Sequence, residues 1–219
     1  LRKSSRGWKK STGQSVQTGL SHSGVASRRH AGKIIESGKV MVNRQVVTEK
    51  GFRVDPAKDK ITVSGRPVGK EEKKYYFLFN KPEEVISTAI DTHGRKKVVD
   101  FFENVGARLY PVGRLDKDTT GLMIITNDGP FAQKLTHPSF KVEKEYTVTV
   151  KGRLTEKNMR RIMSGIRVEG RMTSPCRVRS IESSPDGLST YRVILHEGRK
   201  RQVKKMFKAV GFTVERLGR

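Results

Sequence analysis

The chain has 219 residues, a formal net charge of +24 and a hydrophobic share of 34%. This length is enough for one domain of ordinary size and a small one, and the low hydrophobic share indicates long polar segments beside a modest core. The charge favours a polyanionic partner, most commonly nucleic acid. Because no apolar run of about 18 residues exists, a membrane-spanning helix is excluded. Because Cys176 is the single cysteine, an intrachain disulfide and a cysteine-rich zinc site are excluded.

Residues 1–15 are predicted to form a disordered basic arm, because they are rich in Arg, Lys, Ser and Gly and contain no acidic residue. The first acidic residue of the chain is Glu36. Such an arm suits an RNA-grasping tail, which we favour, or the remnant of an organellar transit peptide. The arm holds no apolar secretory segment. The expected location is the bacterial cytoplasm, with the plastid or the mitochondrial matrix as the alternative.

Residues 16–66 are predicted to form a small basic domain. Ser27 is a good N-cap and Gly38 a good stop for a helix between them. Two short strands are predicted on either side of the pair Asn43 and Arg44, and a further strand at its end, after which residues 67–74 have the composition of a linker.

The order of these elements, together with the motifs at residues 24–29, 38–43 and 55–63, resembles the S-four domain, a small RNA-binding module. The first helix departs from the family pattern, since Ser15 and Thr18 stand where an Arg and a Lys are usual. The resemblance implies that exposed basic side chains of this domain contact RNA. The candidates are Arg28, Arg29, Lys33, Lys39 and Arg44.

Charge density supports this assignment. Residues 1–70 contain 16 basic and 4 acidic residues, whereas the remaining two thirds of the chain contain 30 and 18, so both parts have a net charge of +12. Contacts to phosphate supply most of the sequence-independent affinity for nucleic acid, and the basic first third is therefore predicted to dock on RNA. The alternative is a solvated basic face without a partner.

The second domain, residues 75–219, opens with an apolar segment at 75–79, which is predicted to be a buried strand. Lys81 follows it within Asn-Lys-Pro, and its side chain is expected either to approach a site or to face solvent. Residues 97–102 fit a short helix or an extended segment.

The most informative stretch is residues 110–129. Its apolar part at 122–126 predicts a strand buried on both faces. Asp116 precedes that strand in a loop, where a rigid scaffold can present a carboxylate to a substrate, and Arg114 can reach the same space. The alternative is a turn in which the Asp116 side chain bonds nearby backbone amides.

The motif Gly-Arg-Leu-Asp at 113–116, with the segments at 118–122 and 126–129, resembles the catalytic motif of ribosomal RNA pseudouridine synthases, in the branch of small-subunit synthase A and large-subunit synthase B. The resemblance implies an α+β fold, in which the small RNA-binding domain precedes a larger, mixed and mainly antiparallel sheet flanked by helices. It also implies an isomerase that converts a uridine in ribosomal RNA to pseudouridine, with Asp116 as the catalytic carboxylate.

Further along, a helix is predicted at 131–136, followed by His137, for which we expect a structural role. Residues 144–151 alternate cleanly and predict a strand. Its Tyr146 is either a core aromatic residue or, as the resemblance implies, the flat partner of a base removed from its stack.

Thr155 is predicted to cap a helix that ends at Gly165, and two strands follow at 175–181 and 190–195. The last helix contains an apolar stripe that includes Val203 and Phe207. A second stripe offers cations to phosphates, and its members are Arg201, Lys204, Lys205 and Lys208.

The resemblance assigns Arg199 as the partner of the catalytic carboxylate and Arg114 as the residue that fills the gap left by the extruded nucleotide. The reaction adds and removes no atoms, so no cofactor or metal is expected, and the enzyme is expected to be a monomer. The family continues beyond the equivalent of Arg219, so a truncated C-terminus is expected. The alternatives are a non-catalytic ribosome-assembly factor of the same fold and a DNA-binding protein, for which no recognition module is visible.

Overall fold

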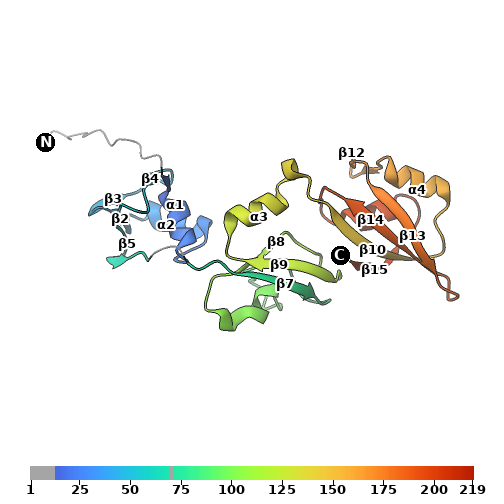
Figure 1. Cartoon of the computed structure of the whole chain (residues 1–219), viewed down its shortest axis with the longest axis horizontal. Coiled ribbons are helices and arrows are strands. Elements are labelled where there is room, and N and C mark those ends of the chain that lie inside the picture. Colours follow the sequence, from blue (N-terminus) through green and yellow to red (C-terminus); the bar gives the residue numbers. More distant parts are fainter. Residues whose placement is uncertain (1–12, 70–71) are drawn as a thin grey trace. The chain divides into compact units, whose positions relative to one another are not determined.

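The computed structural model describes residues 13–69 and 72–219, and the chain divides into two compact units, Leu1–Lys74 and Tyr75–Arg219 (Figure 1). Most of the expected basic arm, residues 1–12, lies outside the described residues. Within the described residues, one hydrophobic core belongs to the first unit and two belong to the second. No helix in these ranges is long and apolar enough to cross a membrane.

The first unit combines two helices with short antiparallel strands. The helices are α1 (Val16–His22) and α2 (Arg28–Glu36), and four strands form a sheet in the order β3 (Gln45–Val47), β2 (Val40–Val42), β5 (Ile61–Val63) and β6 (Arg66–Pro67). A separate pair joins β1 (Gln14–Ser15) to β4 (Arg53–Val54). Asn43 and Arg44 both have positive φ, as a tight turn between β2 and β3 requires. The predicted helix and hairpin are confirmed.

Side-chain caps explain where both helices begin. The Ser27 hydroxyl accepts a hydrogen bond from the backbone N–H of His30, and the Ser15 hydroxyl accepts one from Thr18. The Ser15 and Thr18 hydroxyl oxygens also lie 2.8 Å apart. The two residues that depart from the family pattern therefore stabilise the start of α1.

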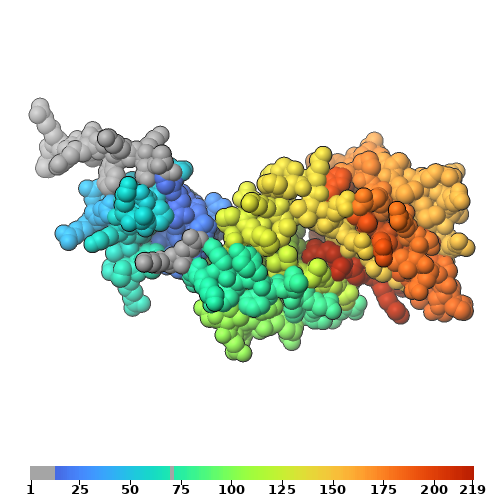
Figure 2. All heavy atoms as spheres, in the orientation of Figure 1, coloured from blue at the N-terminus to red at the C-terminus, as the bar shows by residue number. Residues whose placement is uncertain are grey.

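The second unit contains two larger sheets. One has the order β7 (Tyr76–Lys81), β9 (Gly121–Thr126) and β8 (Tyr110–Val112), and the other has the order β13 (Arg177–Ser183), β14 (Leu188–Leu195), β10 (Lys144–Lys151) and β15 (Val214–Gly218). All these pairs are antiparallel. The sheets adjoin where Thr120 and Gly218 form a parallel bridge and the Leu122 N–H donates to the Arg219 carbonyl at 2.7 Å. Figure 2 shows the red atoms of the C-terminal strand against the yellow-green atoms of the smaller sheet.

Helices and turns surround these sheets. They are the 3-10 helices η1 (Val98–Val105) and η2 (Pro138–Phe140), the α-helices α3 (Gly129–Thr136), α4 (Glu156–Met163) and α5 (Gln202–Lys208), and the hairpin of β11 (Arg167–Val168) and β12 (Arg171–Met172). The apolar stripe of α5 packs with Val148, Val193 and Ile162 in one core, as expected from its spacing. The smaller sheet has its own core, and Tyr146 contacts both cores.

Two expectations about burial are wrong. The strand expected to be buried at 75–79 alternates, with Tyr76 53% and Leu78 76% exposed, and Leu122 on β9 is 50% exposed. The reason is that this three-stranded sheet buries only one of its faces, so every second side chain points away from the core. Residues 97–102, which fitted a helix or an extended segment, contribute to η1.

Candidate active site

A cavity of about 1270 Å³ in the second unit is lined by residues of both sheets and of the segment before α5. Four residues singled out in the sequence line this cavity: Arg114, Asp116, Tyr146 and Arg199. They come from the loop between β8 and β9, from β10 and from the turn that leads into α5. The fold therefore brings together residues that are up to 85 positions apart in the sequence, from Arg114 to Arg199.

The loop that contains Asp116 is held on both sides of that residue. The Ser87 hydroxyl donates to the Leu115 carbonyl at 2.7 Å and accepts from the Leu115 N–H at 3.1 Å. The Leu115 side chain is buried in the core of the smaller sheet, and the Thr119 N–H donates to the Asp116 carbonyl. These contacts fix the backbone while the Asp116 side chain is half-buried at the cavity.

In the part of the chain that the structure describes, the Asp116 carboxylate forms no hydrogen bond and no ion pair. The alternative interpretation of the motif required this side chain to bond nearby backbone amides. That arrangement is not present. A carboxylate that is held by its backbone and free of internal partners is available to a ligand in the cavity.

Lys81 does not face solvent, which was one of the two expectations for its side chain, since it is fully buried. Its ammonium donates to the carbonyls of Pro82 at 2.7 Å, Val85 at 2.8 Å and Lys117 at 3.2 Å. Burial lowers its pKa, and the nearby carboxylates, Asp118 first among them, act in the opposite direction. Lys81 thus ties the end of β7 to the residue that follows Asp116. The burial of Lys81 could have been predicted from the alternation of β7, because Phe77, Phe79 and Lys81 share the inward face.

Arg199 lines the cavity but does not form the expected ion pair with Asp116. Its guanidinium donates to the carbonyls of Arg171 and Met172 and lies 3.4 Å from the carboxylate of Glu197. Glu197 also accepts from the Ser174 N–H and from the amide of Gln202. The reason is that the turn before α5 directs Arg199 towards β12, where a nearer carboxylate and two carbonyls satisfy it.

Cations of α5 and of its N-cap reach the loop between β8 and β9 at Asp118, two residues after Asp116. Lys204 Nζ lies 2.7 Å from an Asp118 oxygen, and Arg201 lies 3.4 Å from the same oxygen. The hydrogen bond from Lys204 is the main cause that lowers the pKa of Asp118. The Lys204 side chain is only 15% exposed. Lys205 forms an ion pair with Glu169 at 2.7 Å. The basic stripe expected to face RNA is therefore largely engaged within the protein.

Tyr146 is half-buried on β10, where it lies opposite Val193 of β14. Two residues earlier, Lys144 also lines the cavity, and its ammonium donates to the carbonyls of Val142 and His196. Burial lowers the pKa of Lys144. Sequence reasoning missed this cation, because its position on an alternating strand gave no reason to separate it from other surface lysines.

The candidate RNA contacts of the first unit are all exposed. They are Arg28, Arg29 and Lys33 on α2 and Lys39 and Arg44 beside β2. Their side chains take part in no ion pair among residues 13–69. They stay available to an external anion.

His137 lies at the junction of α3 and η2. Its ring nitrogen accepts a hydrogen bond from the Ser139 N–H and lies 2.7 Å from the Ser139 hydroxyl. The residue caps η2, which is the structural role expected for it.

The family model described as RNA pseudouridylate synthase matches residues 75–209, and the S4 domain model, the S-four module, matches residues 15–61. The chain belongs to the RNA pseudouridylate synthase family. This confirms the resemblance and the α+β fold class, and the synthase is accordingly an isomerase.

Relatives and solved structures agree with this assignment. The synthase is 45% identical over 205 residues to ribosomal large subunit pseudouridine synthase B of Bacillus subtilis, a match that covers 93% of this chain and 83% of the relative. It is 37% identical to the putative ribosomal large subunit pseudouridine synthase SVR1, chloroplastic, of Arabidopsis thaliana, covering 91% of this chain and 52% of the relative. A crystal structure of a pseudouridylate synthase matches with a TM-score of 0.62 and 27% identity, over 94% of this chain and 86% of the other.

Proposed function

We propose that this synthase converts a specific uridine of ribosomal RNA to pseudouridine, with Asp116 as the catalytic carboxylate acting on a flipped-out nucleotide. The observation that carries the proposal is the Asp116 carboxylate itself, which has a fixed backbone, no internal partner among the described residues and access to a cavity that Tyr146 also lines. Relatives named for the large ribosomal subunit support ribosomal RNA as the substrate.

The chemistry needs one bond to break and another to form. The bond from the sugar C1′ to uracil N1 breaks, the uracil turns, and C5 bonds to C1′; the proton lost from C5 is replaced by one gained at N1. Asp116 either adds to the sugar and leaves again or removes a proton from it, as carboxylates do in related glycosidic chemistry. No atom is gained or lost overall, so the residues of the chain suffice for this scheme.

The other cavity residues have roles that follow from their shapes and charges. Tyr146 offers a flat apolar surface to the extruded uracil. Arg114 is exposed beside Asp116, and its planar guanidinium can stack in the gap that the nucleotide leaves. Arg199 holds the turn before α5 through Glu197, so we assign it to positioning that turn and not to direct pairing with Asp116.

The exposed cations of the first unit, which include Arg28 and Arg29, support a role of this unit in docking on the RNA backbone. The bacterial relatives favour the bacterial cytoplasm as the place of action, with the plastid as the alternative, since one relative is named as chloroplastic.

The test is Asp116→Asn in an assay of tritium release from 5-tritiated uridine in unmodified ribosomal RNA transcripts. We expect release to fall by at least about 1,000-fold, because the substitution removes the reacting group, while RNA binding by filter retention stays within about two-fold. Glu103→Gln is the matched control, since Glu103 is an exposed carboxylate on η1 that does not line the cavity. Unchanged release by Asp116→Asn would contradict the proposal.

A further inference from the structure

The loop between Ile86 and Lys97 forms one wall of the cavity and is closed at its base. Ile86 and Lys97 form a parallel bridge, the Ile86 N–H donates to the Lys96 carbonyl at 3.0 Å, and the Val98 N–H donates to the Ile86 carbonyl at 3.1 Å. Ser87, the first residue of the loop, holds Leu115 through the two hydrogen bonds described above. The loop is therefore fastened to the segment that positions Asp116.

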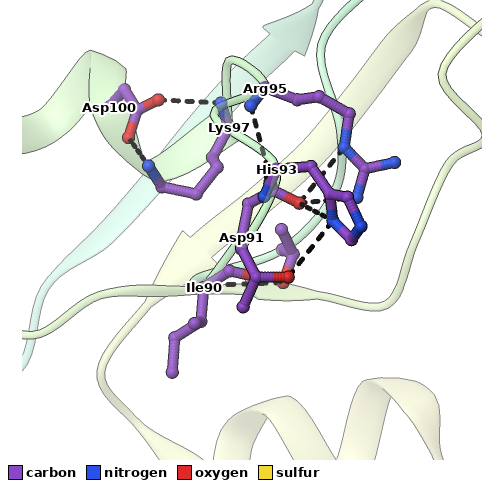
Figure 3. A network of polar contacts seen from close by, with 8 residues as sticks. Ile90, Asp91, His93, Arg95, Lys97 and Asp100 are labelled. Carbon is purple, nitrogen blue, oxygen red and sulfur yellow. Dashed lines mark hydrogen bonds and ion pairs between the residues drawn. The ribbon is translucent and has the colours of Figure 1, made fainter.

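The tip of this loop is ordered by a single carboxylate. The Asp91 side chain is 4% exposed and accepts hydrogen bonds from the N–H groups of His93 at 3.0 Å and Arg95 at 2.8 Å, and from the Arg95 guanidinium at 3.1 Å (Figure 3). The Thr88 hydroxyl adds two contacts to Ile90, donating to its carbonyl and accepting from its N–H. Backbone and side-chain contacts thus fix the loop on both sides of Ile90.

Ile90 is an exposed large hydrophobic residue of this ordered loop. Its side chain is 71% exposed, lines the same cavity as Arg114 and Asp116, and points away from the contacts around Asp91 (Figure 3). A β-branched side chain has little rotamer freedom, so a loop fixed on both sides presents it as a rigid apolar projection. Apolar side chains of this kind separate stacked bases when they enter a nucleic acid.

We propose that Ile90 is a wedge that contacts the base next to the target uridine and keeps the gap in the RNA stack open while the uridine occupies the cavity. The proposal rests on the proposed function. Because Ile90 has no hydrogen-bonding group on its side chain, the contact recognises a base face and not a base edge. Arg114 and Ile90 then approach the same gap from two different loops, one polar and one apolar.

The test is the kinetics of Ile90→Ala on 5-tritiated ribosomal RNA transcripts. We expect KM to rise by about 10-fold, because removing apolar groups from a binding site weakens binding by about that factor, with a smaller change in kcat. Ile90→Leu is expected to restore most of the affinity. Ile181→Ala is the matched control, because Ile181 is 47% exposed on β13 and does not line the cavity. A KM for Ile90→Ala within two-fold of the wild-type value would contradict the proposal that Ile90 is a wedge.

A second measurement separates a wedge from a structural role. An RNA fragment that contains the target uridine carries 2-aminopurine as its neighbour, and its fluorescence rises when that base loses its stacking partner. In the Asp116→Asn background, which removes turnover, Ile90→Ala is expected to reduce the rise on binding by at least half. On a fragment with an abasic site beside the uridine, where the gap already exists, the binding defect of Ile90→Ala is expected to disappear.

Persistence of the full defect on the abasic fragment would show that Ile90 only maintains the loop, and would overturn the wedge. Failure of the proposed function gives a different result, because Asp116→Asn would then release tritium as the wild type does, whatever the effect of Ile90→Ala.

Discussion

At the scale of single residues, two charged groups of the same loop system have opposite environments. Asp116 is fixed through its backbone, and its carboxylate has no partner within residues 72–219. Lys81 is fully buried, and three backbone carbonyls occupy its three N–H donors. The first group is left free for a substrate, and the second orders the backbone that carries the first.

This contrast predicts the effect of Lys81→Met. The substitution leaves the Pro82 and Val85 carbonyls without the ammonium that they now accept from, and unsatisfied buried acceptors destabilise. We expect the free energy of unfolding to fall by about 3 kcal/mol and kcat to fall by about 10-fold or more, because a displaced catalytic group loses alignment. Urea unfolding followed by circular dichroism, and tritium release under folding conditions, measure the two effects.

Lys117→Met is the control for that experiment. Lys117 is a neighbouring lysine, but its side chain is 51% exposed and its ion pair with Glu84 is at the surface. Surface pairs contribute little to stability. A loss of stability for Lys117→Met as large as that for Lys81→Met would show that burial of Lys81 is not the cause.

At the scale of elements, the apolar stripe and the basic stripe of helix α5 have different functions. Val203, Met206 and Phe207 fasten the helix to the larger sheet, while Lys204 reaches across to Asp118 in the loop before β9. This ion pair connects an element of the larger sheet to an element of the smaller one. The catalytic loop is therefore held from both sides of the cavity, by Ser87 and Lys81 on one side and by Lys204 on the other.

A double-mutant cycle measures this connection. For Lys204→Met and Asp118→Asn we expect a coupling of about 0.5–1 kcal/mol in the free energy of unfolding at pH 7. The value is small because Asp118 is 47% exposed and solvent screens the ion pair. Lys204 holds the pKa of Asp118 below its ordinary value. The coupling is therefore complete above about pH 4 and is lost as the pH falls through the native pKa. A coupling that does not weaken at all as the pH falls below about 4 would refute the ion pair as its origin.

At the scale of the whole molecule, charge and chemistry are divided between the two units. The candidate RNA contacts on α2 and beside β2, Arg28 and Arg29 among them, have no ion pair among residues 13–69. Basic residues near the cavity, such as Lys204 and Lys205, are engaged by Asp118 and Glu169. RNA affinity that depends on salt is therefore expected to come mainly from the first unit, and the chemistry from the second.

The salt dependence of RNA binding tests this division. Replacing Arg28, Arg29 and Lys33 together by Ala is expected to make the plot of log affinity against log salt less steep by about 0.7 to 0.9 for each phosphate that is no longer neutralised. The value of kcat at saturating RNA is expected to stay within about two-fold. Lys50→Ala, which removes a lysine paired with Glu36 at 2.6 Å, is the control. An unchanged slope for the triple variant would place the phosphate contacts elsewhere.

The sequence by itself determined the features that depend on neighbours in the chain. Ser27 and Thr155 cap helices where expected, residues 144–151 alternate as a half-buried strand, and the apolar stripe of α5 is buried. Each follows from local hydrogen bonding or from side-chain periodicity. The family motif, whose residues are contiguous, likewise predicted Asp116 as a candidate carboxylate, and Asp116 lines the cavity.

Only the tertiary structure decided which distant groups meet. Nothing near Lys81 in the sequence shows that the Lys117 carbonyl will accept a hydrogen bond from it. Nothing near Arg199 shows that the carbonyls of Arg171 and Met172 on β12 will accept hydrogen bonds from its guanidinium. The exposure of Leu78 and Leu122 also depends on which face of their sheet is covered. Burial and ion pairing at these positions are set by the packing of elements that are remote in the chain, and local patterns do not contain that information.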